Sequence, residues 1–501
     1  MSGGSPEKQI VHDACHVYRA YVNLAAADAS SRVSEGNRRT LVPALLIAVL
    51  SSVGVVVSLM QTLVVPIIPK LPTLLNTSAS NASWVITATL LAGAVTTPIS
   101  GRLGDMFGKR RVLLTNLVLL VLGSVVCAVS SSLAPAIVGR VLQGAAFGAI
   151  PLGISIMRDE LPAERVGSAI AIMSATLGVG GALGMPLAAA IAQYSDWHML
   201  YWVAVVLGAL CAALCYFLVP ESPVRTPARF DFLGALGLSV ALLALLIPIT
   251  KGADWGWAGP GTLSLFAVSV VVFLGWGWYE VRQRTPLVDL RVTARPRVLF
   301  TNIASIAVGF AFYGMSLTFP QLLMAPEQTG YGFGLTMVQA GLALAPTGFV
   351  MMLLSPVSAK LSAARGPKVT LILGSIVIAA GYVCALMLMN SVWQIMIAAM
   401  IVAGGIGLAY AAMPALIMGA VPITETAAAN GLNSLMRSVG TSSSSAVMGV
   451  VLAHMTMKLG HFTFPAKDAF HTTFLISVAA AVVGVLFALC IPMRKSADAA
   501  E

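Results

Sequence analysis

Fourteen long apolar stretches constrain this chain more than any other feature of its sequence. Each holds at most one Asp, Glu, Lys or Arg, and they occupy residues 42–68, 84–101, 112–131, 134–157, 167–192, 199–219, 232–250, 261–279, 298–324, 334–358, 369–389, 391–418, 428–455 and 471–492. A helix needs about 20 mostly apolar residues to cross roughly 30 Å of hydrocarbon, where each backbone N–H and C=O must be paired within the segment. Together with a mean hydropathy of +0.90, this pattern predicts an all-α integral membrane protein with fourteen transmembrane helices.

The basic residues predict which side of the membrane each loop faces. Lys and Arg are enriched in short cytoplasmic loops. With the N-terminus inside, 23 of the 29 Lys and Arg residues fall in cytoplasmic segments, four fall in outer segments, and two lie within spans. An even number of spans then places both termini in the cytoplasm of a multi-pass cell-membrane protein. Anchoring at the inner membrane face explains the net charge of +10 without a nucleic-acid partner.

Several chemical activities have no support in the sequence. The six cysteines show no CxxC pair or disulfide pattern, and the run His12-Asp13-Ala14-Cys15-His16 lies in a polar tail whose spacing does not favour a metal site. No Walker A, HExxH or GxSxG sequence is present, so we expect neither an ATPase nor a membrane hydrolase. We therefore expect no enzyme, cofactor or metal, and an ion gradient remains the common source of energy.

The run GRLGDMFGKRR at 101–111 places one acid and four bases in eleven consecutive positions between spans 2 and 3. Its glycines predict a tight loop that holds Asp105 and the bases at fixed positions below the helices. The run resembles the loop signature of the major facilitator superfamily, in which the Asp and bases form a charge network that locks two halves together on the cytoplasmic side. The resemblance implies a cytoplasmic gate made by Asp105, Arg102, Gly101, Gly108, Lys109 and Arg110.

A weaker second copy of this run indicates an internal repeat. At a shift of 258 positions, Arg102, Leu103, Gly108 and Arg110 fall on Lys360, Leu361, Gly366 and Lys368. Asp105 falls on Ala363, so the repeat lacks the acid. Carrier folds commonly contain such repeats, and we expect two similar six-helix bundles.

The fourth span contains an arginine, Arg140, with Gln143, Gly144 and Gly148 on the same helical face. An arginine within a membrane span is costly unless it faces water or a partner, although a long side chain near a helix end can also reach the headgroups. The run resembles the superfamily's fourth-span motif. That resemblance implies a role in proton coupling for Arg140, Gln143 and Gly144, with Arg140 opening onto a water-filled chamber between the halves.

The fifth span carries small residues at four-residue spacing, Gly180, Gly184 and Ala188, with Pro186 among them. Small residues allow another helix to approach closely, and proline favours a kink. The span resembles the antiporter motif of the exporter branch, which implies a helix interface at Gly180, Gly184 and Pro186. Ordinary helix packing would give the same stripe.

Two additional spans lie between the expected halves. They are bracketed by RFDFLGALGL at 229–238 and PLVDLRV at 286–292, and this arrangement resembles the 14-span drug:proton antiporter branch. The expected organisation is a polar cytoplasmic tail (1–40), an N-terminal six-helix bundle (41–220), an inserted two-helix hairpin with linkers (221–296), a C-terminal six-helix bundle (297–493) and a short cytoplasmic tail (494–501).

The first span departs from that branch. Met60 stands where the branch typically carries an Asp, and all 19 acidic residues lie in a tail, a loop or at the end of a span. The sequence therefore does not identify a proton-carrying carboxylate. Aromatic rings and a hydrogen-bonding arginine could contact a substrate, so the predicted pathway comprises Arg437, Phe310, Tyr313 and Met60, and favours neutral or weakly acidic amphiphiles over dications.

These features predict a monomeric secondary active transporter that exports small amphiphilic drugs or metabolites by alternating access, in exchange for protons, within membrane lipid. Two alternatives remain on the same fold. The chain could be an uncoupled facilitator or uptake carrier, or it could be a membrane receptor or scaffold that transports nothing.

Overall fold

A computed structural model describes residues 43–492, apart from 65–66, 68–69, 227 and 460–461. The expected tails at 1–40 and 494–501, including Cys15 and its neighbouring histidines, lie outside the described residues. The chain divides into two units, 1–46 and 47–501. Only the first four residues of one helix are described in the first unit, so the packing below concerns the second.

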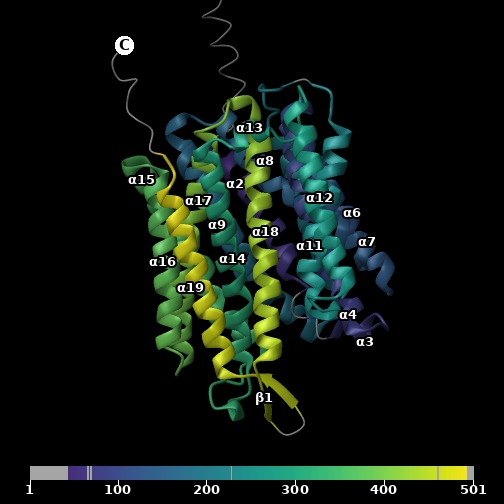
Figure 1. Cartoon of the computed structure of the whole chain (residues 1–501), viewed down its shortest axis with the longest axis vertical. Coiled ribbons are helices and arrows are strands. Elements are labelled where there is room, and N and C mark those ends of the chain that lie inside the picture. Colours follow the sequence, from purple (N-terminus) through teal and green to yellow (C-terminus); the bar gives the residue numbers. More distant parts are fainter. Residues whose placement is uncertain (1–42, 65–66, 68–69, 227, 460–461, 493–501) are drawn as a thin grey trace, which may run out of the picture. The chain divides into compact units, whose positions relative to one another are not determined.

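Long helices make up most of the described chain (Figure 1). They are α2 (Pro43–Thr62), α5 (Trp84–Phe107), α6 (Lys109–Ala128), α7 (Leu133–Gly144), α8 (Ala149–Glu160), α9 (Ala163–Tyr194), α10 (Met199–Leu218), α11 (Phe232–Trp255), α12 (Pro260–Arg282), α14 (Pro296–Met324), α15 (Met337–Arg365), α16 (Pro367–Met387), α17 (Val392–Met418), α18 (Thr426–His454) and α19 (Lys467–Leu489). The four-residue helix η2 (Ala145–Gly148) connects α7 to α8. The short elements are α3 (Leu71–Leu74), α4 (Ala79–Ala82), α13 (Leu290–Thr293), η3 (Glu327–Thr329), η4 (Ile423–Glu425), β1 (Thr456–Leu459) and β2 (Phe462–Pro465).

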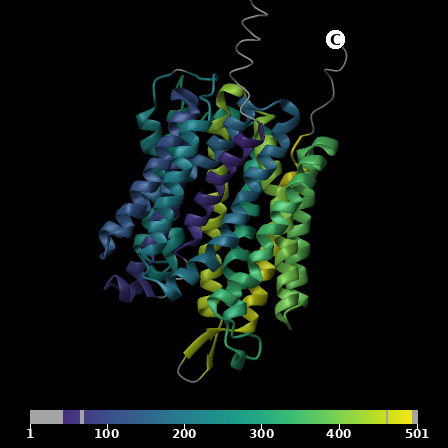
Figure 2. The same cartoon turned by 180° about the vertical axis from the view of Figure 1, so that it is seen from behind.

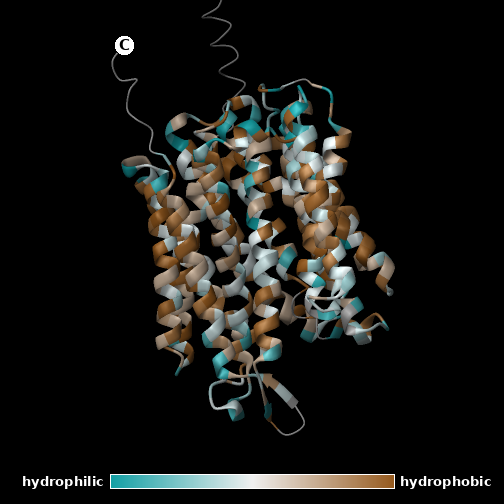
Figure 3. Ribbon diagram, viewed as in Figure 1, coloured by the Kyte–Doolittle hydropathy of each residue, from teal (hydrophilic) through white to brown (hydrophobic). Residues whose placement is uncertain are grey.

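The helix lengths confirm the all-α membrane class. In the described part of the chain, 13 helical stretches are long and apolar enough to cross a membrane, and one of them is the continuous run Leu133–Glu160 made by α7, η2 and α8. The remaining expected span, at 428–455, is α18, whose 29 residues are long enough to cross but include polar residues such as Asn430, Asn433 and Arg437. Figure 3 shows apolar residues along the middle of the helices and polar residues gathered at their ends.

The expected loop at 101–111 is wrong. Helix α5 continues through Asp105 to Phe107, and α6 begins at Lys109, so Gly108 alone separates them. Gly108 has φ +114°, a backbone conformation that side chains with a Cβ rarely adopt. A single glycine therefore reverses the chain, and the other two glycines of the motif lie within a helix.

A β-hairpin that the sequence analysis did not anticipate follows α18. Strands β1 and β2 pair antiparallel, with Thr456 opposite Pro465 and Lys458 opposite Thr463. Figure 2 shows the hairpin beyond the ends of the helices, at the opposite end from α13 in Figure 1. The signal was the alternation of Met457, Leu459 and Phe464 with polar residues, which is typical of a short strand.

Several helix pairs join the predicted N-terminal bundle to the predicted C-terminal one. Helix α5 packs on α18, and α9 packs on α15 and on α17. These contacts are close because small residues face one another. A Cβ added at Gly348 of α15 would lie 2.8 Å from the carbonyl oxygen of Gly178 in α9, and one at Gly431 of α18 would lie 2.9 Å from that of Thr97 in α5.

The inserted hairpin packs beside one of these pairs. Helices α11 and α12 pack on each other, and α11 also packs on both α5 and α18. An apolar cluster fills this junction, with Leu91 of α5, Leu238 and Leu242 of α11, and Leu435 of α18 buried together. Helix α11 of the additional pair therefore contacts both predicted bundles at the same place.

Candidate functional site

The carboxylate of Asp105 joins the end of α5 to the beginning of α18. Its two oxygens accept hydrogen bonds from the backbone amides of Ala427 (3.3 Å) and Ala428 (2.9 Å), in the first turn of α18. Unpaired amides and the helix dipole make this end of a helix partly positive, so a carboxylate there is favoured. Asp105 is 1% exposed. A buried charge therefore connects two helices that are far apart in sequence.

Lys109 forms ion pairs with this carboxylate and with a second one, that of Asp159. Its Nζ lies 3.6 Å from Asp105 Oδ1 and 2.6 Å from Asp159 Oδ2 at the end of α8. It also donates a 3.2 Å hydrogen bond to Thr426 Oγ1 of α18, and it is 0% exposed. Asp159 receives a further hydrogen bond of 2.5 Å from Ser222 Oγ. The ends of α5, α6, α8 and α18 thus share one buried network.

Four of the predicted gate residues, Asp105, Lys109, Arg110 and Gly101, meet in this network or next to it. The backbone amide of Arg110 donates to Glu221 Oε1 at 3.1 Å, and the guanidinium of Arg110 lies 5.5 Å from the centre of the Tyr216 ring. Gly101 faces Ala427 so closely that an added Cβ would overlap its carbonyl oxygen. Sequence reasoning did not assign Glu221 or Thr426 to the gate, because they follow other spans and come near α6 only in the folded chain.

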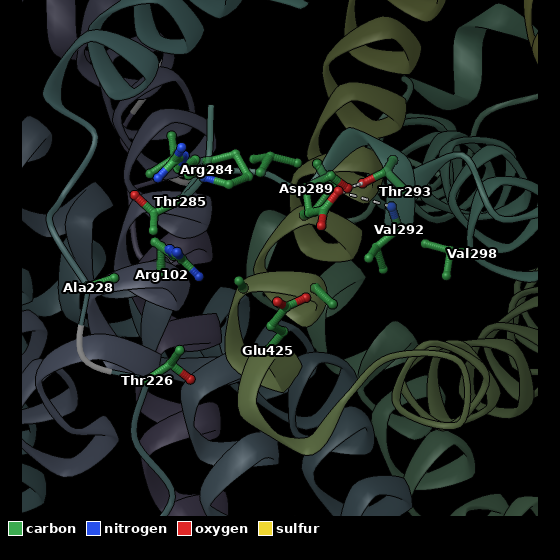
Figure 4. Close-up of a pocket in the computed structure, with 16 residues that line it drawn as sticks. Arg102, Thr226, Ala228, Arg284, Thr285, Asp289, Val292, Thr293, Val298 and Glu425 are labelled. Carbon is green, nitrogen blue, oxygen red and sulfur yellow. Dashed lines mark hydrogen bonds between the residues drawn. The ribbon is translucent and has the colours of Figure 1, made fainter. Parts of the chain in front are cut away.

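Arg102 lies in a separate cavity of about 220 Å³ at the same end of the helices. The cavity is formed by the end of α5, Thr226 and Ala228, the linker at 284–289, α13, α14, η4 and α18. In Figure 4, Arg102, Arg284 and Thr285 lie on one side, Asp289 and Val298 on the other, and Glu425 between them. Arg102 is 7% exposed, and in the described part of the chain no hydrogen bond or ion pair holds its guanidinium.

A second cavity of about 230 Å³ lies among α2, α5, α9, α14 and α15. Its wall is mostly apolar, and in the described chain none of the lining residues is Asp, Glu, Lys or Arg. The polar side chains at its surface are Ser58, Gln61, Thr62, Tyr313, Ser316 and Thr347. Hydroxyl and amide groups on a mainly apolar wall suit an uncharged molecule that can make a few hydrogen bonds.

The predicted pathway residues divide between this cavity and its surroundings. Tyr313 lines the cavity, whereas Met60, Phe310 and Arg437 are not among the residues that line it. Arg437 of α18 is buried, with its guanidinium 4.9 Å from the centre of the Tyr410 ring and hydrogen-bonded to Ser434 Oγ at 2.6 Å.

Arg140 is buried within protein and not exposed to lipid. Its Nε donates a 2.9 Å hydrogen bond to the carbonyl oxygen of Val85 in α5, and its Nη1 donates to Gln143 Oε1 at 2.7 Å. Gln143 Nε2 in turn donates to Ser124 Oγ of α6 at 2.8 Å. The expectation that Arg140 opens onto the central chamber is not met, because Arg140 does not line this cavity and its guanidinium is bonded between α5 and α7. Gly144 allows this approach, since an added Cβ would lie 2.5 Å from the carbonyl oxygen of Thr89.

The predicted interface residues of α9 face two different helices. Gly180 lies against α2, where an added Cβ would be 2.6 Å from Ser58 Cβ, and Gly184 lies against Thr62 of the same helix. Pro186 faces α15, because a Cβ added at Gly341 would lie 3.1 Å from Pro186 Cγ. One stripe of α9 therefore contacts its own predicted bundle, and another contacts the opposite one.

A set of membrane-crossing helices that encloses an apolar cavity and closes one end with a buried ion network has the architecture of a membrane carrier. The model of the Major Facilitator Superfamily matches residues 50–440 and 303–501. The chain belongs to this superfamily, and it is a transporter and not an enzyme.

Named relatives and a solved structure agree with this assignment. The tetracenomycin C resistance and export protein of Streptomyces glaucescens is 29% identical over 416 residues, covering 80% of this chain and 74% of that protein. The probable multidrug resistance protein EmrY of Escherichia coli (strain K12) is 30% identical over 293 residues, or 58% of this chain and 56% of that protein. The human organic anion transporter MFSD10 (TETRAN) has the same fold, with a TM-score of 0.63 at 14% identity over 89% of this chain and 99% of that chain.

Proposed function

We propose that this transporter exports neutral or weakly acidic amphiphilic molecules by alternating access, in exchange for protons. The observation that carries the proposal is the uncharged, mostly apolar cavity whose wall combines α2, α5 and α9 with α14 and α15. Because these helices come from both predicted bundles, rocking of one bundle against the other would change access to the cavity.

The ion network at the end of α5 acts as the cytoplasmic gate in this proposal. Asp105 and Lys109 connect α5, α6 and α8 to the first turn of α18. These contacts hold α5 and α18 together. Separation of the two helices would open the apolar cavity toward the cytoplasm. The excess of basic residues at this end of the spans supports a cytoplasmic location for it, with both termini on the same side.

The names of the relatives support the direction of transport. The Streptomyces protein is named for resistance and export, and the Escherichia coli protein for multidrug resistance. For this chain we propose the same direction and a similar class of small amphiphilic substrate. We also propose that it functions as a monomer, since the cavity and the gate are built from one chain.

Proton coupling is assigned to the Arg140, Gln143 and Gly144 group. One hydrogen bond of Arg140 joins α7 to α5, and the other holds Gln143, which bonds to Ser124 of α6. A change in this cluster would therefore alter the position of α5, which also carries the proposed gate residue Asp105.

An uncoupled facilitator is the second candidate, because one observation favours it. None of the described residues that line the cavity is a carboxylate, and the first span presents Gln61 to the cavity instead. A substrate-competing proton would then need to bind elsewhere in the protein.

Purified protein in liposomes distinguishes these functions. We expect uptake of a neutral amphiphile into everted proteoliposomes to increase several-fold when the lumen is made acidic. A bis-quaternary dye should be transported far more slowly than its neutral analogue. Transport that ignores the pH gradient would favour the facilitator, and faster transport of the dication would contradict the proposed substrate class. Binding without any flux would favour a receptor.

A further inference from the structure

Two carboxyl groups meet where α11 begins and α12 ends, in the inserted hairpin. Asp231 is the N-cap residue of α11, and its Oδ1 accepts hydrogen bonds from the amide of Gly234 (2.8 Å) and from the hydroxyl of Tyr279 (2.9 Å). Its other oxygen, Oδ2, is buried and has no hydrogen-bond partner among the described residues. An N-cap needs only one of the two oxygens, so Oδ2 is free to bind something else.

Glu280 presents its own unpaired oxygen to the same place. This residue is 1% exposed, and its Oε1 accepts a 2.6 Å hydrogen bond from the amide of Val288. Its Oε2 is buried without a hydrogen-bond partner in the described chain. A Cβ added at Gly234 would overlap Asp231 Oδ2 and would lie 2.8 Å from Glu280 Oε2, so the two unpaired oxygens face one small gap beside Gly234.

No basic side chain of the described residues neutralises this pair. Arg282 of α12 lies 3.9 Å from the centre of the Trp278 ring, and Arg291 of α13 donates to the carbonyl oxygen of Val281. The helices packed on α11 contribute the apolar cluster around Leu91 and Leu435. Seven other charged residues lie in the neighbouring segments, and among the described residues none of them makes a hydrogen bond or ion pair to either carboxyl group. They are Arg102, Asp105, Arg229, Arg284, Asp289, Glu425 and Arg437.

Two ionised carboxylates would repel each other strongly in such a gap, and each would keep an unsatisfied buried oxygen. We propose that Asp231 and Glu280 form a proton-binding site, in which one proton is shared between Asp231 Oδ2 and Glu280 Oε2. The protonated group donates a hydrogen bond to the ionised one, so a single proton satisfies both oxygens and removes the repulsion. This site goes beyond the proposed transport function, since it does not require that the transported molecule exchange for protons.

The proton-binding site also lies next to the cavity that holds Arg102, through Val288. Val288, whose amide binds Glu280, lines the same cavity as Arg102 and packs in the cluster that includes Leu432 of α18. Loss of the shared proton would separate the two carboxylates and disturb the 284–289 linker that forms one wall of that cavity. A change in the protonation of this pair would thereby alter how the inserted hairpin packs at the junction of α5 and α18.

Infrared spectroscopy of the full chain in liposomes tests the site directly. We expect the C=O stretch of one protonated carboxyl group near neutral pH, and its loss on raising the pH. Glu280→Gln and Asp231→Asn should both abolish that band, whereas Glu327→Gln, at an exposed glutamate in the loop between α14 and α15, should leave it unchanged. In Glu280→Gln the amide can donate to Asp231 Oδ2 in place of the proton, so this variant should remain folded.

The pH dependence of unfolding gives a second readout. A shared proton is held by the folded protein and released from the unfolded chain near neutral pH, so stability must fall as pH rises through the titration of the pair. In Glu280→Gln, the slope of the unfolding free energy against pH should become less steep, by the equivalent of about one bound proton, than in the wild type or in Glu327→Gln. A band that persists in Glu280→Gln, or an unchanged slope, would overturn the proposal. A Tm that rises with sodium but not with choline, in the absence of the band, would instead identify a cation site.

Discussion

The side chain of Asp105 accepts a 2.9 Å hydrogen bond from the backbone amide of Ala428, a residue 323 positions away in the chain. The bond joins the last turn of α5 to the first turn of α18, where the helix dipole favours a negative charge. The proposed gate is therefore a contact between a carboxylate and a helix end, and Lys109 adds ion pairs to Asp105 and to Asp159.

Replacing Asp105 by Asn should weaken this contact. The amide can still accept a hydrogen bond, but it loses the charge that interacts with the helix end and with Lys109, at a cost of about 1–3 kcal/mol. We expect at least a tenfold loss of export with normal membrane insertion. Asp468→Asn is the matched control, because it makes the same change at an exposed aspartate in the first turn of α19. Efflux retained in the Asp105 variant would remove the residue from the gate.

Arg140→Ala should abolish proton-driven export. The substitution leaves Gln143 Oε1 without its buried donor, at a cost of about 1–3 kcal/mol, and removes one donor from the Val85 carbonyl, which keeps the hydroxyl of Thr89 at 3.3 Å. The check is transport with and without a pH gradient, together with a thermal melt. Arg165→Ala, at an exposed arginine near the start of α9, should behave as wild type. A stable Arg140→Ala protein that still responds to the gradient contradicts a coupling role.

Gly101→Ala should prevent α5 and α18 from closing as they do here. The added Cβ would overlap the carbonyl oxygen of Ala427, and overpacking of this kind costs about 1–3 kcal/mol. We expect spin labels at the end of α5 and the beginning of α18, where Asp105 meets Ala428, to move apart and export to fall. Gly275→Ala in α12 introduces the same methyl group into open space and should change neither quantity. Equal label distances in both variants would mean that the helices can relax around the methyl group.

Gly181→Leu should fill part of the central cavity without disturbing the fold. Gly181 lines the cavity, and nothing lies within 4 Å of a Cβ added there. Since leucine favours a helix over glycine, the melting temperature should stay the same or rise. Binding of a neutral amphiphile, measured by tryptophan fluorescence, should weaken about tenfold, corresponding to about 1.4 kcal/mol. Gly275→Leu serves as the control, and unchanged affinity in Gly181→Leu would place the substrate elsewhere.

The sequence located the spans well because crossing a membrane requires long apolar helices. The expected range 232–250 corresponds to a helix at Phe232–Trp255, and 391–418 corresponds to Val392–Met418. The motif at 101–111 was located but misread, since its charges suggested a loop although α5 continues to Phe107. Charged residues can end a membrane span without ending the helix, because a helix is stable in the interfacial layer as well.

The partners of the site residues were harder to predict. Asp105 and Lys109 were identified from the motif, yet Asp159, Thr426 and Ser222 belong to other segments and carry no local signal. Arg140 was expected to face a chamber, but its hydrogen bonds to Val85 and Gln143 hold the guanidinium between α5 and α7. The Asp231 and Glu280 pair is separated by a complete helical hairpin, so its two halves appear as unrelated acids in the sequence.

The sequence by itself determined the class of the protein and the positions of its helices, because these follow from hydropathy and charge along one segment at a time. Only the tertiary structure decided which helix faces contact each other, which residues line the cavity and which buried charges are paired. Those outcomes depend on close packing and hydrogen-bond geometry between segments as far apart as Asp105 and Ala428, which local sequence patterns do not encode.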